Sequence, residues 1–205
     1  MTIEKILSNY LESNMYVLGK DDQVIFIDAG CEVDRVERVV GGRKVQGILL
    51  THGHYDHAIF ARECAEKFGT KVYCMKEAFE ILADSEANYS EGHLVIDDFS
   101  NFVAIEEGKL TLGNFEIQVY KTPGHTKDSA GFLIEGNYFA GDTLFDEGVG
   151  RTDLISSDKA QMVETLGKIE DIPFEMVYCG HGESSNRKQQ KRNIKTFKKF
   201  LSRRK

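Results

Sequence analysis

The chain has 205 residues, of which 41% are hydrophobic and 29% charged, a composition typical of one globular domain with a sizeable core. No apolar run approaches the roughly 20 residues that span a bilayer, so a membrane-spanning helix is not expected. The first 14 residues include Glu4 and Glu12 and no continuous apolar stretch, unlike a secretory signal. We therefore predict a cytoplasmic protein that forms a single domain over residues 1–205.

The net charge of −7 is unevenly distributed along the chain. Between Ser184 and Lys205 there are ten lysines and arginines and no acid, a pattern found in some nucleic-acid-binding proteins. However, Ile194, Phe197 and Leu201 recur at helical spacing. This spacing predicts a helix with one apolar stripe docked on the core and its lysines in solvent. We therefore expect neither a nucleic-acid partner nor a membrane partner.

The first half of the chain alternates strand-like and helix-like segments. Apolar runs at 15–18 and 24–27 flank the turn-like residues 19–22, which predicts a hairpin. Glycines favour helix ends, and Gly41 and Gly69 each follow a helical pattern. The further elements predicted here are a helix over 33–40, a short buried strand at 48–50, a helix over 57–68 and a strand over 71–74.

The stretch 76–107 is the least regular part of the sequence. It predicts a helix near 77–83 and then a long loop past Asn88, Tyr89 and Ser90, and such a loop inside a compact domain is often functional. The second half then predicts strands at 111–112, 115–120, 130–134, 137–140 and 176–179, with a helix over 158–169 and the terminal helix. We interpret the chain as two similarly patterned halves.

The densest cluster of metal-ligand side chains is the segment from Thr51 to His57, THGHYDH. Three imidazoles and one carboxylate fall within six residues, directly after the predicted strand 48–50. Loops at strand ends hold side chains rigidly, and this donor chemistry suits zinc, iron or manganese. His52 and His54 alternate along an extended segment and can converge on one ion, whereas Asp56 and His57 can reach a second.

Two of the three other histidines repeat this placement, whereas His93 lies in the irregular loop and matches no motif. The chain has six, and His125 and His181 each follow a predicted strand beside a glycine, which permits close backbone approach. Asp142 also follows a strand. Cys179, near His181, is predicted to be a buried thiol and not a ligand. The distribution predicts one metal site, not several isolated surface histidines.

These motifs resemble those of the metallo-β-lactamase superfamily in their order and spacing. They are H-x-H-x-D-H at 52–57, G-H-T at 124–126, G-D-T-L-F at 141–145 and G-H-G at 180–182. The resemblance covers nearly the whole chain and implies an α/β fold, an αβ/βα four-layer sandwich with the metal site at one edge. It implies that His52, His54 and His125 bind one ion, that Asp56, His57 and His181 bind a second, and that Asp142 bridges both. Asp28 matches an acid that orients the ligand imidazoles.

The resemblance implies a hydrolase with two divalent metal ions, zinc first, with iron and manganese as alternatives. A pair of cations lowers the pKa of the water between them, and the resulting hydroxide attacks a carbonyl while one ion stabilises the oxyanion. We assign Asp56 and Asp142, which hold the cations, to catalysis. Because the ligand histidines must be neutral, activity should fall at acid pH.

Residues 141–145 and 148–153 resemble the glyoxalase II branch of the superfamily. Its members hydrolyse S-2-hydroxyacylglutathione, a thioester, which implies a small-molecule substrate for this chain. Arg151 matches a substrate-binding lysine, and a guanidinium can bind a carboxylate bidentately. The alternative for Arg151 is a surface salt bridge to Asp153 or Asp146.

Three departures from that branch concern the substrate. Longer members carry an extra C-terminal helical domain, whereas 24 residues follow His181 here. A tyrosine expected near Asp153 is missing, and Arg187 and Lys188 match the usual basic positions only approximately. The chain therefore resembles the short, single-domain glyoxalase II-like proteins, and its chemistry is better supported than its substrate.

Three other hypotheses remain. A persulfide dioxygenase shares H-x-H-x-D-H but uses a single iron held by two histidines and an aspartate, so the number of bound metals distinguishes it. A lactonase or β-lactamase would keep the fold, although the predicted cytoplasmic location disfavours a β-lactamase. A non-enzymatic or nucleic-acid-processing member is supported by the basic tail alone.

Overall fold

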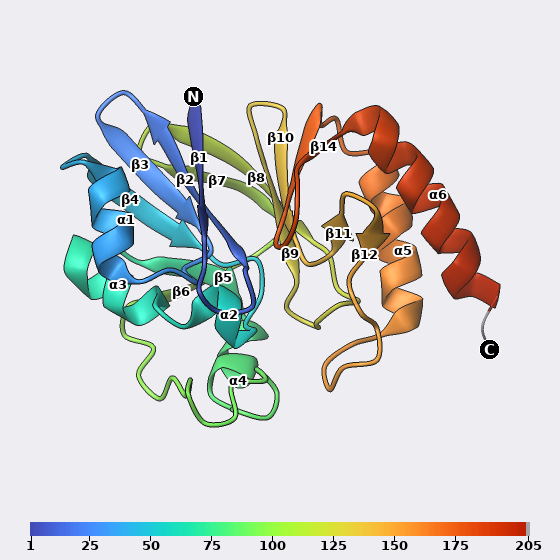
Figure 1. Ribbon diagram of the computed structural model, residues 1–205, viewed down its shortest axis with the longest axis horizontal. Helices are drawn as coiled ribbons and strands as arrows, with labels where there is room; N and C mark the ends of the chain where they lie inside the picture. The colour runs from blue at the N-terminus through green and yellow to red at the C-terminus, as the bar shows by residue number, and fades with distance from the viewer. Residues whose placement is uncertain (204–205) are drawn as a thin grey trace.

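Two six-stranded sheets pack face to face between two layers of helices in the computed structural model, which describes residues 1–203 (Figure 1). The first sheet has the order β1 (Thr2–Leu7), β2 (Asn14–Lys20), β3 (Gln23–Ile27), β4 (Lys44–Leu49), β5 (Val72–Met75) and β6 (Phe102–Ile105). The second has the order β14 (Ser185–Asn186), β13 (Met176–Cys179), β10 (Asn137–Gly141), β9 (Ala130–Ile134), β8 (Phe115–Lys121) and β7 (Gly108–Leu112). A small hairpin joins β11 (Leu144–Phe145) to β12 (Gly148–Val149).

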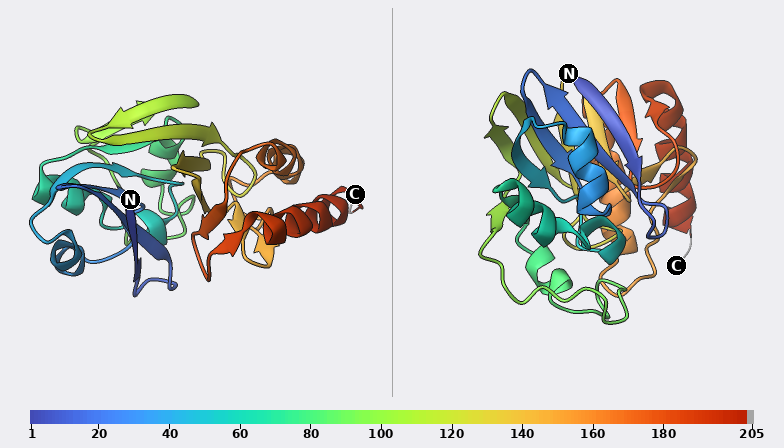
Figure 2. Two further views of the ribbon diagram at one scale, coloured as in Figure 1. Left: turned by 90° about the horizontal axis from the view of Figure 1, so that it is seen from above. Right: turned by 60° about the vertical axis from the view of Figure 1, so that its left-hand side comes forward.

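The helices form the two outer layers. The first sheet is covered by α1 (Val33–Val40), α2 (Tyr55–Ala58), α3 (Ala61–Phe68) and α4 (Ala78–Leu82). The second is covered by α5 (Lys159–Glu170) and α6 (Arg187–Arg203), which lie side by side on its outer face (Figure 2). The predicted αβ/βα four-layer sandwich is confirmed.

The alternation of side chains along β3 shows why its sequence is apolar throughout. Val24 and Phe26 pack toward the first helical layer, whereas Ile25 and Ile27 pack into the core between the two sheets. Successive side chains of a strand point to opposite faces, and here both faces are buried. A strand in the middle of four layers therefore appears in the sequence as a continuous apolar run.

The helix predicted over 57–68 is wrong as one element, because the chain forms α2 and α3 with a break at Ile59 and Phe60. Backbone hydrogen bonds connect this region to the end of β3. The Ala29 N–H donates to the His57 carbonyl at 2.7 Å, and the Phe60 N–H donates to the Ala29 carbonyl at 3.0 Å. The break thereby fixes α2, which carries two of the predicted metal ligands, against the first sheet.

The terminal helix docks as predicted. Ile194 is fully buried, Leu201 is 9% exposed, and both join the core beneath the second sheet with Phe197 packed against them. The last two residues of the basic tail, 204 and 205, lie outside the described residues. Within residues 1–203, no helix has both the length and the apolar character needed to cross a bilayer.

Candidate metal centre

Every predicted metal-site residue follows the carboxyl end of a strand. Asp28 follows β3, the segment from Thr51 to His57 follows β4, His125 follows β8, Asp142 follows β10 and His181 follows β13. In the first sheet β3 and β4 are parallel, and in the second sheet β10 and β13 are parallel. The carboxyl ends of each pair therefore lie at the same edge of their sheet. The two sheets thus bring side chains from both halves of the chain to a common rim.

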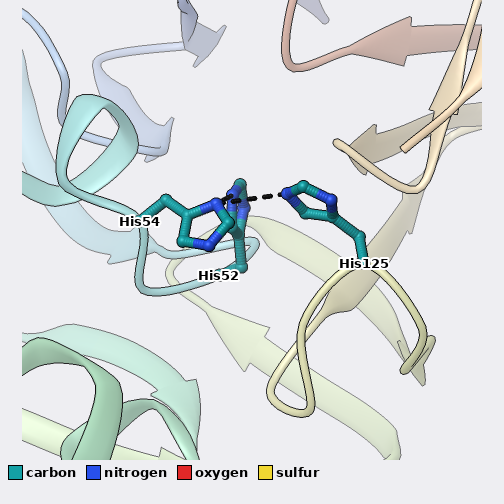
Figure 3. A group of neighbouring side chains, drawn as sticks. All are labelled: His52, His54 and His125. Carbon is teal, nitrogen blue, oxygen red and sulfur yellow. Dashed lines mark hydrogen bonds between the residues drawn. The ribbon is translucent and has the colours of Figure 1, made fainter. Parts of the chain in front are cut away.

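Three imidazoles form the first group of the cluster. The Nδ1 atom of His54 lies 3.1 Å from the Nε2 atom of His52 and 3.1 Å from the Nε2 atom of His125 (Figure 3). All three side chains are buried, with at most 6% of each residue exposed. Three ring nitrogens that converge on one point in this way form a set of lone pairs suited to one cation.

The second group consists of Asp56, His57 and His181. The Nε2 atom of His181 lies 3.2 Å from Asp56 Oδ2 and 3.3 Å from His57 Nε2. Ligand-type atoms within this group lie within 4.8 Å of one another, as they do within the first group. The two groups share the same rim and are separated by one carboxylate.

That carboxylate belongs to Asp142, which contacts both groups. Its Oδ1 atom lies 3.4 Å from His57 Nε2, and its Oδ2 atom lies 3.6 Å from His125 Nε2 and 3.5 Å from His181 Nε2. The structure therefore brings together all seven side chains predicted as ligands, with Asp142 between the two groups. This is the arrangement that a carboxylate shared by two cations requires.

Contacts on the far side of the rings fix their orientation. Asp28 Oδ2 lies 2.8 Å from His57 Nδ1, and the Arg151 carbonyl lies 3.1 Å from His125 Nδ1. Because the oxygen accepts the proton at Nδ1, the lone pair of each ring in its neutral form is on Nε2, which faces the cluster. Thr51 Oγ1 lies 3.1 Å from His52 Nδ1 in the same relation. Asp28 is therefore where the sequence predicts it, directly behind a ligand histidine.

Atoms without partners show that the cluster suits cations. Asp142 Oδ1 is buried and makes no hydrogen bond, its contact with His57 Nε2 at 3.4 Å being an ion pair, and a buried carboxylate oxygen without a hydrogen bond is costly. A Cβ atom at Gly180 would lie 2.0 Å from this oxygen, so only glycine leaves the space beside it. Histidine nitrogens and carboxylate oxygens around such space fit two divalent ions such as zinc, iron or manganese.

Electrostatics keep the first group uncharged. Burial lowers the pKa of His54 to about 3, with neighbouring His125 as the next cause. Burial, followed by His57 and His54, lowers the pKa of His52 well below its ordinary value, and burial also lowers the pKa of His125. All three imidazoles are consequently neutral at physiological pH, the form that binds metal.

In the second group, neighbouring carboxylates raise the histidine pKa values instead of leaving them lowered by burial. Burial lowers the pKa of His57, but Asp56, Asp142 and Asp28 outweigh it and raise the pKa well above the ordinary value. The pKa of His181 is raised in the same way, chiefly by its hydrogen bond to Asp56 against the effect of burial. Burial raises the pKa of Asp142, yet His57 and the other imidazoles bring it well below its ordinary value. Both histidines must therefore release protons when a cation binds.

The remaining predictions have mixed outcomes. Arg151 lies near the cluster, but its guanidinium forms a bidentate pair with Asp153 at 2.9 and 3.1 Å, and both side chains are about two-thirds exposed or more. Cys179 is fully buried in the core beneath the second sheet, and burial raises the pKa of its thiol to about 12, as expected of a structural thiol.

Arg187, considered as a basic substrate contact, is a structural residue. Its guanidinium donates to the carbonyls of Ile172 and Phe174 and lies over the Phe174 ring, 5.0 Å from its centroid. The side chain thus caps the chain after α5 and is already fully engaged there. These contacts account for Arg187 without a substrate role, in line with its only approximate match to a basic substrate position.

Two residues near the cluster were not singled out from the sequence. Thr51 donates from both its N–H and its hydroxyl to Asp28, at 2.7 and 2.9 Å, and so holds the acid behind His57. Tyr89 packs on His54 from the irregular loop, with ring centroids 5.3 Å apart. Thr51 opens the predicted motif, and Tyr89 lies in the long loop that we expect from the sequence to be functional, but no pattern in the sequence assigned either residue a partner.

Comparison with known proteins points to the family that the sequence motifs resemble. A family model described as the metallo-beta-lactamase superfamily matches residues 9–181. Hydroxyacylglutathione hydrolase GloC of Haemophilus influenzae is 29% identical over 207 residues, which cover 94% of this chain and 96% of that protein.

Two solved structures are also similar. The BLEG-1 B3 metallo-beta-lactamase has a TM-score of 0.85 and 26% identity, covering 96% of this chain and 99% of its own. TTHA1623, solved in a di-iron-bound form, has a TM-score of 0.81 and 26% identity, covering 93% and 98%. The fold is therefore shared with these proteins along nearly the whole chain.

Proposed function

The chain belongs to the metallo-β-lactamase superfamily, and from this membership we propose that it is a single-domain dinuclear-metal hydrolase of a thioester such as S-2-hydroxyacylglutathione. The observation that carries the proposal is the shared carboxylate. Asp142 lies within 3.6 Å of histidine nitrogens from both ligand groups. A site for one ion does not need this second set of donors.

Two bound cations supply Lewis acidity, which lowers the pKa of water and polarises a carbonyl oxygen. The residues of this chain hold those charges in place. The neutral imidazoles of His52, His54 and His125 supply uncharged donors on one side, and Asp56 supplies a carboxylate on the other. Asp142 fixes the separation of the two groups, and Asp28 holds the His57 ring so that Nε2 faces the centre.

A thioester suits this donor set because its leaving group needs little help. An unperturbed thiol has a pKa of about 8.5, so the thiolate can depart without a dedicated general acid. The carboxylates of Asp56 and Asp142 can then remain ionised as ligands throughout. The similarity to hydroxyacylglutathione hydrolase GloC supports the same substrate class.

A hydrolysis panel on zinc-loaded and on iron-loaded protein tests this proposal. We expect S-lactoylglutathione and a second thioester to be hydrolysed faster than a lactone or a cephalosporin. The similarity to BLEG-1 makes β-lactam hydrolysis the second candidate, and turnover of the cephalosporin alone would favour it. One iron per chain with thiol-dependent oxygen uptake would instead support a persulfide dioxygenase and end the dinuclear proposal.

If Arg151 binds substrate, replacing Arg151 and replacing its partner Asp153 should change KM in opposite directions. A guanidinium that binds a substrate carboxylate contributes a charge-assisted bond, so Arg151→Ala should raise KM for S-lactoylglutathione about tenfold. Asp153 occupies this guanidinium in the structure, and Asp153→Ala should therefore lower KM. Steady-state kinetics of both variants provide the measurement. A surface salt bridge without a substrate role predicts equal KM values for both variants and the wild type.

The titration of the second ligand group predicts how metal affinity depends on pH. The raised pKa values of His57 and His181 mean that these rings take up protons at a pH above the ordinary histidine value of 6.5. As the pH falls through these raised values, protons compete with the metal, and the affinity for Zn²⁺ should fall about tenfold per pH unit for each proton. Competition with a chromophoric chelator between pH 8 and pH 6 measures this. A flat profile would contradict the charge arrangement described above.

A further inference from the structure

We propose that Tyr89 is a substrate-binding residue that contacts the thiol half of the substrate, an inference that rests on the proposed thioester hydrolysis. Tyr89 belongs to the irregular loop between α4 and β6, which lies beside the loop before α5 along one edge of the molecule (Figure 1). Both its ring and its hydroxyl contact elements of the metal centre.

The ring packs directly on a ligand imidazole. The Tyr89 and His54 rings are perpendicular, with an interplanar angle of 90° and centroids 5.3 Å apart. This edge-to-face geometry is the favourable one for an aromatic pair. Tyr89 therefore forms a wall of the site beside the first ligand group, and with 37% of the residue exposed it can still be reached by a substrate.

The hydroxyl is held by the segment that also carries Arg151. The N–H of Ile155 donates to the Tyr89 hydroxyl oxygen at 2.7 Å. Because that oxygen accepts a proton from the backbone, the hydroxyl proton is left to donate elsewhere. The carbonyl of Arg151 meanwhile orients His125. One short segment thus supports both a ligand histidine and the tyrosine beside it.

The backbone at Tyr89 is strained, and its neighbours hold it there. Its φ of +60° is unfavourable for a bulky side chain. The flanking Asn88 and Ser90 are buried, and both side chains donate to the Leu94 carbonyl at 3.0 Å. The Asn88 carbonyl accepts the Tyr55 N–H at 3.0 Å, next to Asp56. The loop is therefore tied to the ligand-bearing helix α2 while it directs Tyr89 at the site.

The position of the two donors indicates which part of a substrate they contact. The reacting carbonyl must lie at the metal cluster, so the groups at the rim can reach only the part that projects outward. With a small hydroxyacyl group, that part is the thiol half. The Tyr89 hydroxyl and the Arg151 guanidinium both donate, so they fit a thiol that carries amide or carboxylate oxygens. A simple alkanethiol ester offers them no acceptor.

Tyr89→Phe, assayed on two thioesters, tests this inference. The variant keeps the ring on His54 and removes the hydroxyl, which also leaves the Ile155 N–H without this acceptor. For S-lactoylglutathione we expect KM to rise about 3- to 10-fold with kcat nearly unchanged, since a neutral hydrogen bond is lost from bound substrate and transition state alike. For the lactoyl thioester of ethanethiol we expect no change in either constant. Tyr10→Phe, which removes a phenol hydroxyl from the β1–β2 loop, serves as the matched control and should resemble the wild type on both esters.

The outcomes separate this inference from the proposed function. A wild-type protein that hydrolyses neither thioester overturns the proposed function and the inference with it. If the wild type hydrolyses both, equal effects of Tyr89→Phe on the two esters, or none on either, overturn the role of Tyr89 alone. Metal content, measured for each variant, and Tyr89→Leu, which also removes the ring from His54, show whether a loss arises from a disturbed metal centre.

Discussion

Asp142→Ala is expected to lose most of the bound metal and to slow hydrolysis by roughly 10²- to 10³-fold, since metal and oxyanion stabilisation supply several kcal/mol. Its carboxylate contacts His57, His125 and His181, and these histidines belong to both ligand groups. Removing it leaves the imidazoles and Asp56 to hold two cations without the negative charge between them. Elemental analysis of the purified protein and turnover of S-lactoylglutathione measure the two effects.

Glu147→Ala provides the control for this variant. Glu147 is an exposed acid in the turn between β11 and β12, a short way further along the chain. It should retain two metals per chain and wild-type turnover. Near-normal activity in Asp142→Ala, with circular dichroism confirming that both variants are folded, would refute the shared-carboxylate arrangement.

Asp28→Asn is expected to weaken metal binding or activity by about 10- to 100-fold, although Asp28 itself is not a predicted ligand. Its carboxylate accepts from the Thr51 N–H, the Thr51 hydroxyl and His57 Nδ1. The asparagine side chain has an NH2 group in place of one carboxylate oxygen, so at least one of these three donors would face another donor. The φ of +62° at this position is tolerated by asparagine, so the substitution changes the chemistry with little backbone strain.

Asp28→Ala separates orientation from stability. It leaves buried donors without an acceptor, which costs about 1–3 kcal/mol for each unsatisfied group, so the metal-free protein should also unfold at a lower denaturant concentration. We expect Asp28→Asn to lose less stability than Asp28→Ala. If both variants kept wild-type zinc affinity in chelator competition, the orienting role of Asp28 would be wrong.

The location of elements was predictable where the sequence pattern is local. The buried strands β3 and β10 appear as apolar runs, and α1 and α3 end at Gly41 and Gly69, which adopt the left-handed conformation expected of helix ends. The two edge strands of the first sheet, β1 and β6, were not predicted in this way. Most of β1 and half of β6 are exposed, so neither strand has a regular apolar alternation.

The sequence by itself determined the donor chemistry of the site, because residue types and their spacing after strands are written in the chain. Three histidines and an aspartate within six residues indicate metal ligands before any fold is known. The later histidines and Asp142 could be added because each occupies the same position relative to a strand. Family membership followed from the same short motifs.

The tertiary structure alone decided how these side chains meet. Which nitrogen of His57 faces the cluster depends on Asp28, and the orientation of His125 depends on the Arg151 carbonyl. Tyr89 reaches His54 only because the loop after α4 folds back against Ile155. These contacts join segments 26 to 66 residues apart, as the Arg151 and Ile155 bonds show. Local propensity carries no information on such contacts, because the packing of the two sheets decides which distant residues meet.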